Sequence, residues 1–365
     1  MSPQSRGYSF RVREPLPLNQ LNCLPGRIAV VLGSGGYTGA FQPKVLKLLG
    51  VHNIPITKVI GVSVGAINGG SFVANGTADE LIDVWSSIRK PSDVFELQPK
   101  LYFIRKLGMP ESVYRYEPLA RLVGRIHEER LVRSAMEFIA VATRVYPELR
   151  TLQERLNNGK VAYFSTKDPE MVAYPKKMLL AVLASCSFPT GFPPVPLEYR
   201  GEKGWYVDGA FKRLFPLLKA LEDGYNTIIA VRCRSNRTRG PYPKNWLERT
   251  AYSLDLLHDK DEKDEVQLVR LLSFFSRYLK TEIDESSEDF QKIRALSDRL
   301  KNINLFLVEP EQLPDTLNTV SFKRGDLHRA MDEGERVASE VLAPLISHYR
   351  PRPGGEQGGS GPGGA

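Results

Sequence analysis

The stretch Val59-Ile60-Gly61-Val62-Ser63-Val64-Gly65-Ala66-Ile67 joins a β-branched run to an apolar, helix-compatible segment through a Gly-x-Ser-x-Gly pentapeptide. This order predicts a strand, a sharp turn with Ser63 at its apex and a helix, which is the layout of a nucleophile elbow. Gly61 and Gly65 suit such a turn because a side chain there would meet closely passing backbone. The N-terminus of the helix would favour negative charge beside Ser63. An ordinary strand–helix turn is the alternative interpretation of the pentapeptide taken alone.

The composition narrows the class of protein. The 365 residues carry a formal net charge of +8, which is compatible with an anionic membrane surface or a nucleic acid. The basic residues are scattered rather than striped, so we expect no nucleic-acid binding. Three widely spaced cysteines (Cys23, Cys186 and Cys233) argue against a disulfide framework and indicate a reducing compartment. No Cys-x-x-Cys or His-x-x-x-His pair occurs, so we expect no structural zinc site.

Targeting features are lacking in the sequence as read. Residues 1–27 contain arginines and prolines but no apolar core segment, which predicts that they are not a signal peptide. The longest apolar stretch, around residues 178–188, is too short to span a bilayer. These features predict a cytoplasmic protein whose contact with membranes is peripheral. Export by a signal-independent route would leave no such mark in the sequence.

The order of predicted elements indicates one α/β domain, in which helices flank a central, mostly parallel sheet. The chain opens with a strand at 28–32, a glycine loop at 33–39, a helix at 40–49 and the elbow strand, an order that predicts a right-handed crossover. Residues 1–26 are expected to form an arm and residues 27–235 the core. Residues 236–350 would add a helical extension and the last strand to the same domain, and residues 351–365 a disordered Gly/Pro tail.

The periodicity of apolar residues places the other elements. Helices are expected at 78–88, 175–185, 246–300 and 326–347, and a helical insertion at 91–133. Strands are expected at 136–143, 160–166, 195–199, 205–207, 226–232 and 302–308. The strands at 136–143 and 160–166 would form a hairpin or lie side by side, with a short connection at Asn157-Asn158-Gly159.

The glycine loop Gly33-Ser34-Gly35-Gly36-Tyr37-Thr38-Gly39 follows the first predicted strand. Successive backbone amides in such a turn form a concave anion site, for which Gly35 and Gly36 are the expected donors. A P-loop would need Gly-Lys-Ser/Thr, which is absent. A dinucleotide fingerprint beginning at Gly33 would need glycine where Thr38 stands. A glycine-rich turn without a ligand is the remaining alternative.

A carboxylate is expected at the same edge of the sheet. Asp208 ends the short strand in Trp205-Tyr206-Val207-Asp208-Gly209-Ala210, where it would face a pocket, although a plain Asp-Gly turn is the alternative. A Ser-His-Asp triad is disfavoured because no histidine has a strand-end or glycine-flanked context. An α/β-hydrolase also places several strands before its elbow, whereas one precedes it here. The histidines are His52, His127, His258, His328 and His348.

Taken together, these segments resemble the patatin-like phospholipase family. Its Gly-Gly-x-Arg/Lys-Gly, Gly-x-Ser-x-Gly and Asp-Gly-Gly/Ala motifs correspond to residues 35–39, 61–65 and 208–210, and Ala184-Ser185-Cys186-Ser187-Phe188-Pro189 resembles the segment before its aspartate. The resemblance covers about residues 27–235. Two positions depart from the pattern, because Ser34 stands where glycine is usual and Thr38 where Arg or Lys is usual. The motif residues carried over are Gly39, Gly61, Gly65, Gly209 and Ala210.

The resemblance implies a patatin-like three-layer sandwich and a serine lipid acyl hydrolase of the phospholipase A or lysophospholipase type. It implies a Ser–Asp dyad, with Ser63 as nucleophile and Asp208 as general base, and an oxyanion hole at Gly35 and Gly36. It implies no metal or other cofactor, and a phospholipid or other acyl-lipid substrate. A non-catalytic or partner-activated lipid-binding relative, silenced by the changes in the glycine loop, is the alternative.

Two segments are candidates for contact with lipid. Val266–Lys280 has a helical pattern, with an apolar face made by Leu268, Leu271, Leu272, Phe275, Tyr278 and Leu279. Such a helix either lies in a membrane interface or packs on the protein's own core, and the second is the default expectation. Residues 100–133 are aromatic and arginine-rich, and form the other candidate lid.

Overall fold

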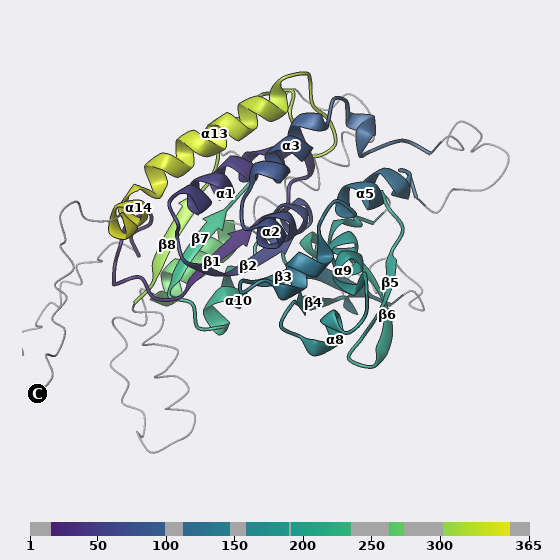
Figure 1. Cartoon of the computed structure of the whole chain (residues 1–365), viewed down its shortest axis with the longest axis horizontal. Coiled ribbons are helices and arrows are strands. Elements are labelled where there is room, and N and C mark those ends of the chain that lie inside the picture. Colours follow the sequence, from purple (N-terminus) through teal and green to yellow (C-terminus); the bar gives the residue numbers. More distant parts are fainter. Residues whose placement is uncertain are drawn as a thin grey trace, which may run out of the picture.

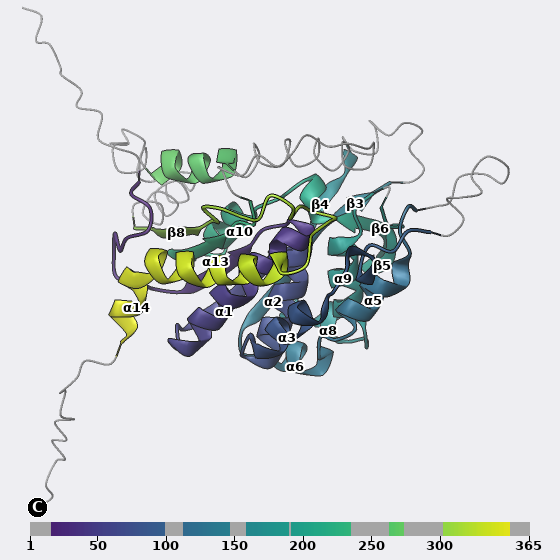
Figure 2. The same ribbon diagram turned by 90° about the horizontal axis from the view of Figure 1, so that it is seen from above.

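The computed structural model describes residues 16–98, 112–146, 158–189, 191–234, 263–273 and 302–350. An eight-stranded sheet lies between helices that cover both of its faces (Figure 1, Figure 2). Five strands form its parallel part: β1 (Ile28–Leu32), β2 (Ile56–Val62), β3 (Glu137–Val145), β7 (Thr227–Val231) and β8 (Asn304–Val308). The fold is therefore the expected α/β class, with a central, mostly parallel sheet.

Three more strands extend the sheet beyond β3 through antiparallel pairings. They are β4 (Lys160–Ser165), β5 (Val195–Tyr199) and β6 (Glu202–Asp208). The strand order is β5-β6-β3-β2-β1-β7-β8, and β4 pairs with β3 off this path. The first two predicted strands after the helical insertion are therefore antiparallel neighbours, and the predicted 205–207 strand is the second arm of a longer hairpin.

The continuous apolar runs explain why the middle strands lie at the centre of the sheet. Every residue of β1 and of β7 is buried, because both faces of the sheet are covered by helices. β1 pairs with β2 on one side and with β7 on the other, so the first described strand is the middle one of the five parallel strands. From residue 16 onward, where the description of the structure begins, β1 is the one strand that precedes the elbow strand β2, as predicted.

The helices form two layers. One layer contains η1 (Gly36–Phe41), α1 (Gln42–Val51), α2 (Val64–Asn75), α3 (Asp79–Ser87), α5 (Tyr116–Val123), α6 (Glu128–Arg133), α8 (Pro169–Val172), α9 (Lys177–Cys186) and α13 (Asp326–Val341). The other contains α10 (Leu217–Glu222) and a helix at residues 263–273 (Figure 2). Each layer packs its apolar side chains into a separate hydrophobic core on its own face of the sheet.

Some boundaries differ from the sequence-based expectation. The helix expected at 326–347 is two helices, α13 and α14 (Ala343–Tyr349), which meet at Leu342. Pro344 explains the break, because proline fits the first turn of a new helix but not the interior of a continuing one. The short helices α8 and α10 were not expected at all. The helix expected at 40–49 begins earlier, as the η1 turn.

The helix at 263–273 corrects the expectation for Val266–Lys280. Glu265, Val266, Val269 and Ser273 are buried on this helix, whereas Leu268 and Leu271 are 42% and 47% exposed. The helix therefore packs on the protein's own core, which is the default expectation, through its valines and the partly buried Leu272. Leu268 and Leu271 of the expected apolar face remain exposed. Phe275, Tyr278 and Leu279, like residues 100–111 of the other candidate segment, lie outside the described residues.

The segments at the two ends of the described chain contribute to one sheet edge. Residues 16–26 run along β8, where the amide of Asn19 donates to Leu305 and the Asn304 side chain accepts from the amide of Asn22. α13 packs against α1 and η1 on the opposite side of the same edge. Within the described residues, no helix is both long and apolar enough to pass through a bilayer. The expected tail at 351–365 lies outside the described residues.

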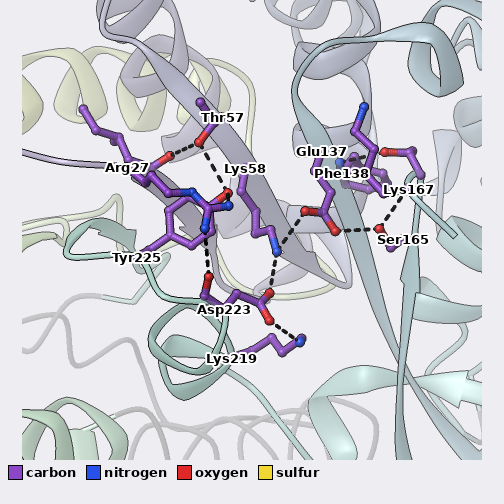
Figure 3. A network of polar contacts seen from close by, with 12 residues as sticks. Arg27, Thr57, Lys58, Glu137, Phe138, Ser165, Lys167, Lys219, Asp223 and Tyr225 are labelled. Carbon is purple, nitrogen blue, oxygen red and sulfur yellow. Dashed lines mark hydrogen bonds and ion pairs between the residues drawn. The ribbon is translucent and has the colours of Figure 1, made fainter. Parts of the chain in front are cut away.

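A buried ionic network holds the amino end of the central strands together (Figure 3). Lys58 on β2 is 4% exposed and contacts two carboxylates, Glu137 at 2.9 Å and Asp223 at 2.5 Å. Asp223 also contacts Lys219 at 2.6 Å, and Glu137 accepts a hydrogen bond from Ser165. Burial alone would lower the pKa of Lys58, but its hydrogen bonds to the carboxylates raise the pKa above its usual value.

We expect Lys58→Met to lower the free energy of unfolding by about 3 kcal/mol, because two partly buried carboxylates would lose the buried cation that they share. Lys44 offers a matched control, since it also bridges two carboxylates, Asp332 and Glu335, but at the surface. Lys44→Met should cost less than about 1 kcal/mol. Urea unfolding followed by circular dichroism measures both. Equal losses in the two variants would contradict a structural role for the buried network.

Candidate active site

Ser63 stands at the apex of the turn between β2 and α2, with φ of 55° and ψ of −125°. A non-glycine residue in this region stores strain of about 1–3 kcal/mol, which the surrounding structure must hold. Two glycines make the turn possible by close approach. A Cβ at Gly61 would lie 2.3 Å from the carbonyl oxygen of Gly65, and one at Gly65 would lie 2.4 Å from that of Leu32. The elbow therefore brings the start of α2 directly against β1.

The backbone of Ser63 is held by the end of α9. Its amide donates to the hydroxyl of Ser185 at 2.9 Å, and that hydroxyl donates to the carbonyl of Val141 on β3 at 2.6 Å. The thiol of Cys186 donates to the carbonyl of Ser63 at 3.1 Å. These two residues lie in the 184–189 segment, for which the sequence suggested no individual roles. They connect the strained turn to its neighbouring strand.

The sheet register brings Asp208 level with Ser63. Val62, the last residue of β2, pairs with Val141 of β3, and the next residue of β3, Ala142, pairs with Asp208. β3 lies between β2 and β6, and neighbouring strands lie about 4.8 Å apart, so the side chains of Ser63 and Asp208 approach each other across a single strand. β6 runs antiparallel to β3, so Asp208 reaches the carboxyl edge of the parallel strands from the opposite direction to that of Ser63.

The Asp208 side chain is buried, with 3% of its residue surface exposed. It accepts a hydrogen bond from the Ser63 hydroxyl and another, of 2.8 Å, from the amide of Ala210. Burial raises the pKa of Asp208 from its usual 3.8 to about 7, although the two hydrogen bonds favour its charged form and oppose the rise. A carboxylate with such a pKa is a far stronger base near neutral pH than a solvated one.

The glycine loop lies on the other side of Ser63, between β1 and η1. Gly36 has φ of 56°, and a Cβ there would lie 2.1 Å from the carbonyl oxygen of Thr319, so no other residue fits. Among the described residues, the amides of Gly35 and Gly36 have no hydrogen-bond acceptor. Both glycines line the same cavity as Ser63 and Asp208. The loop thus offers two N–H donors where an oxyanion would need them.

Uncharged groups hold the loop, which lacks the usual cation at position 38. The Thr38 hydroxyl donates to the carbonyl of Gly35 at 2.8 Å. Gln42 donates to the carbonyl of Gly33 at 2.9 Å, and Asn68 donates to Gln42 at 2.8 Å. The chain of hydrogen bonds continues to Trp85, whose indole N–H donates to Asn68 at 2.9 Å. Neutral hydrogen bonds therefore hold the glycine loop in place, although no basic side chain stands at position 38.

This chain of hydrogen-bonded polar side chains is not among the features expected from the sequence. A signal was present in the sequence, because Asn68 stands among mostly apolar residues of the predicted helix, and both Asn68 and Gln42 are wholly buried in the structure. Buried amides need hydrogen-bond partners, so each predicts a nearby polar group. The identity of the partner cannot be inferred from spacing in the sequence, because several of these hydrogen bonds join residues that are 26 or more positions apart.

The dyad opens into a mostly apolar cavity between α2, α3, α5 and the end of α9. Its described lining includes Val84, Ile88, Val94, Phe95, Val113, Tyr114, Leu119, Leu122, Phe188 and Phe192. Among the described lining residues, the charged side chains are Asp208 and Arg234. No described histidine lines the cavity, and His258 falls outside the described residues. The part of the chain that is described contains no group of three or more metal-ligating side chains.

The comparison with protein families identifies this arrangement. The model of the patatin-like phospholipase family matches residues 30–221, which is more than half of the chain and includes Ser63, Asp208 and the glycine loop. The chain belongs to the patatin-like phospholipase family. The motif resemblance noted in the sequence is thereby confirmed at the level of the family. A search among curated proteins found no match.

Three solved structures share distant likeness with this family member. VipD from Legionella pneumophila is 10% identical, and the match covers 87% of this chain and 66% of VipD, with a TM-score of 0.39. Human GIVD cytosolic phospholipase A2 is 10% identical, and the match covers 89% of this chain and 62% of that protein, with a TM-score of 0.49. The type III effector protein ExoU is 11% identical, and the match covers 88% of this chain and 54% of ExoU, with a TM-score of 0.34. The chain spans two thirds or less of the length of each of these proteins.

Proposed function

We propose that this patatin-like protein is a serine acyl hydrolase that cleaves fatty-acyl esters of phospholipids or related lipids. The observation that carries the proposal is the hydrogen bond between the Ser63 hydroxyl and the buried carboxylate of Asp208. It lies at the polar end of an otherwise apolar cavity. A nucleophile within hydrogen-bond reach of a base, beside unpaired backbone donors, is the arrangement that acyl transfer requires.

In the first half of the reaction, Asp208 takes the proton of the Ser63 hydroxyl as its oxygen attacks the ester carbonyl carbon. The carbonyl oxygen becomes negatively charged, and the amides of Gly35 and Gly36 stabilise it. The partial positive charge at the N-terminus of α2 acts in the same direction. When the tetrahedral intermediate collapses, the bond to the alcohol breaks and the proton on Asp208 passes to the leaving oxygen. An acyl group then remains on Ser63.

In the second half, water replaces the alcohol. Asp208 takes a proton from the water as its oxygen attacks the acyl carbonyl, and the same amides hold the second oxyanion. Collapse breaks the bond to Ser63, whose oxygen recovers its proton from Asp208. The products are a fatty acid and free enzyme. Each step uses only Ser63, Asp208, backbone amides and water, and we propose no cofactor.

The lining of the cavity supports a lipid as substrate. Aliphatic and aromatic side chains suit an acyl chain, and Arg234 offers a cation for the phosphate of a phospholipid. Such substrates reside in membranes, so we infer that the protein works at a membrane surface from the cytoplasm. A lipid-binding relative without catalysis is the alternative, and the hydrogen-bonded pair of Ser63 and Asp208 speaks against it.

Fatty-acid release from phosphatidylcholine vesicles tests the proposal. We expect the wild-type protein to release fatty acid in buffer that contains EDTA, and we expect Ser63→Ala to release none above background. Mass spectrometry of the extracted lipids measures both the acid and the lysophospholipid. If the folded wild type releases no acid from these vesicles or from a soluble acyl ester, the catalytic hypothesis is wrong and the lipid-binding alternative gains support.

A further inference from the structure

The cavity wall is thin where α3 meets α5. Both helices lie on the same face of the sheet as α2 (Figure 2), but α3 packs on α1 and α2 whereas α5 packs on α9. Side chains bridge the seam between them. Val84 and Ile88, from α3 and the residue that caps it, meet Leu122 from α5 in the lining of the active-site cavity. All three are only half-buried, although they are apolar and lie beside the core.

The same side chains also line the outer surface. Val84 and Leu122 line a depression together with Ser71 and Arg125, and Ile88 and Leu122 line a second depression beside it. Leu122 belongs to the lining of the active-site cavity and of both depressions. A single layer of side chains therefore separates the inside of the cavity from the surface at this seam.

α2 leads from the nucleophile to this seam. Val64 and Ile67, on its first turns, line the active-site cavity, and Ile67 and Ser71 line the outer depression. Ser63 and Ser71 are eight residues apart, which corresponds to about 12 Å along a helix axis. A chain that starts at Ser63 and follows α2 thus meets the seam after about that distance. The path is apolar along its length inside the cavity.

We propose that Leu122 is a specificity-determining residue for the length of the acyl chain. The acyl chain runs from Ser63 along α2, and its methyl end meets the side chains of Leu122, Val84 and Ile88. Short chains end inside the closed cavity. Longer chains displace Leu122 and emerge between α3 and α5, where the outer depressions receive them. This inference rests on the proposed function, because it assigns the acyl part of the substrate to the same site.

The test compares kcat/KM for p-nitrophenyl butyrate and p-nitrophenyl dodecanoate. In Leu122→Trp, the larger side chain closes the seam, and we expect the dodecanoate-to-butyrate ratio to fall by at least about tenfold, since each excluded methylene removes binding energy. In Leu122→Ala the seam opens, and we expect the ratio to rise by about threefold or more. Leu180→Trp is the matched control, because Leu180 is 37% exposed on α9 and does not line the cavity. Its ratio should equal that of the wild type.

The outcomes separate this inference from the proposed function. Absence of butyrate hydrolysis by a folded wild type would remove the proposed function itself. An active wild type whose ratio is unchanged in both Leu122 variants would overturn the assignment of the acyl path. Thermal unfolding of each variant identifies any that fails to fold, and because the two substitutions change volume in opposite directions, either one alone still decides the question.

Discussion

Ser63→Ala is expected to lower kcat/KM for an acyl ester by at least about 10⁴-fold, because the attacking oxygen is removed and no other described hydroxyl contacts Asp208. Alanine keeps the Cβ of serine, so the turn at φ of 55° remains as strained as before and no new clash arises. The hydrogen bond to Asp208 is lost, which costs about 1 kcal/mol of stability. Hydrolysis of p-nitrophenyl butyrate measures the effect on activity, and thermal unfolding measures the effect on folding.

Ser71→Ala is the matched control for this variant. Ser71 lies on α2, two turns beyond the elbow, is also nearly buried, and does not line the active-site cavity. Its removal should change butyrate hydrolysis by less than about threefold, which is what an ordinary buried hydroxyl contributes. Appreciable turnover by Ser63→Ala, after contamination by other esterases is excluded, would mean that another group is the nucleophile.

Asp208→Asn is expected to lower kcat/KM by about 10³- to 10⁴-fold while keeping the shape of the site. The amide can still accept the hydrogen bond from Ala210, but it cannot take a proton from Ser63. The pH profile gives a second readout. Because burial raises the pKa of Asp208 to about 7, the wild-type rate should fall about tenfold per unit as the pH decreases below 7. The residual rate of Asp208→Asn should lack this acid limb.

Stability should change in the opposite direction to activity. A carboxyl whose pKa is 3.8 in the unfolded chain and about 7 in the folded protein favours folding when protonated, so its ionisation destabilises the protein as the pH rises from 4 through 7. The shift corresponds to about 4 kcal/mol at pH 8. Asp208→Asn removes this penalty and should therefore unfold at a higher temperature than the wild type at pH 8. Loss of activity from misfolding would instead be accompanied by a lower unfolding temperature.

A histidine variant completes this comparison. His328 is exposed on α13 and does not line the cavity, so His328→Ala should retain both the rate and the acid limb of the wild type. The outcome that contradicts the dyad is an unchanged acid limb in Asp208→Asn, or its loss in a folded histidine variant.

The sequence predicted those features of the site that are written in consecutive residues. Gly61 and Gly65 have a steric reason that local spacing reveals, and the glycine loop follows a buried strand that the apolar run indicates. The contacts between distant segments were not predictable in this way. Ser185 donates to Val141, 44 positions away, and Gln42 accepts from Asn68, 26 positions away, and a pattern of residue types does not encode such distances.

Local patterns did not predict the packed face of a helix or the direction of a strand. The helix at 263–273 has apolar residues on two faces, and the sequence pattern indicates the leucine-rich one as the face that meets either the core or a membrane interface. The structure buries Val266 and Val269 and partly buries Leu272, whereas Leu268 and Leu271 are exposed, because α10 and the sheet meet the valine side of the helix. Similarly, Asp208 was expected at the end of a strand, but nothing in residues 205–210 showed that this strand runs antiparallel to β3.

The central claim is that Ser63 is a nucleophile activated by Asp208, and labelling with a fluorophosphonate ester tests it most directly. The probe forms a covalent bond only with an activated serine oxygen, and the mass of the intact protein shows how many probes are attached. The account predicts one label on the wild type, located at Ser63 by peptide mapping, none on Ser63→Ala and much slower labelling of Asp208→Asn. Labelling of Ser63→Ala at the wild-type rate, or of wild type and Asp208→Asn at equal rates, would contradict it.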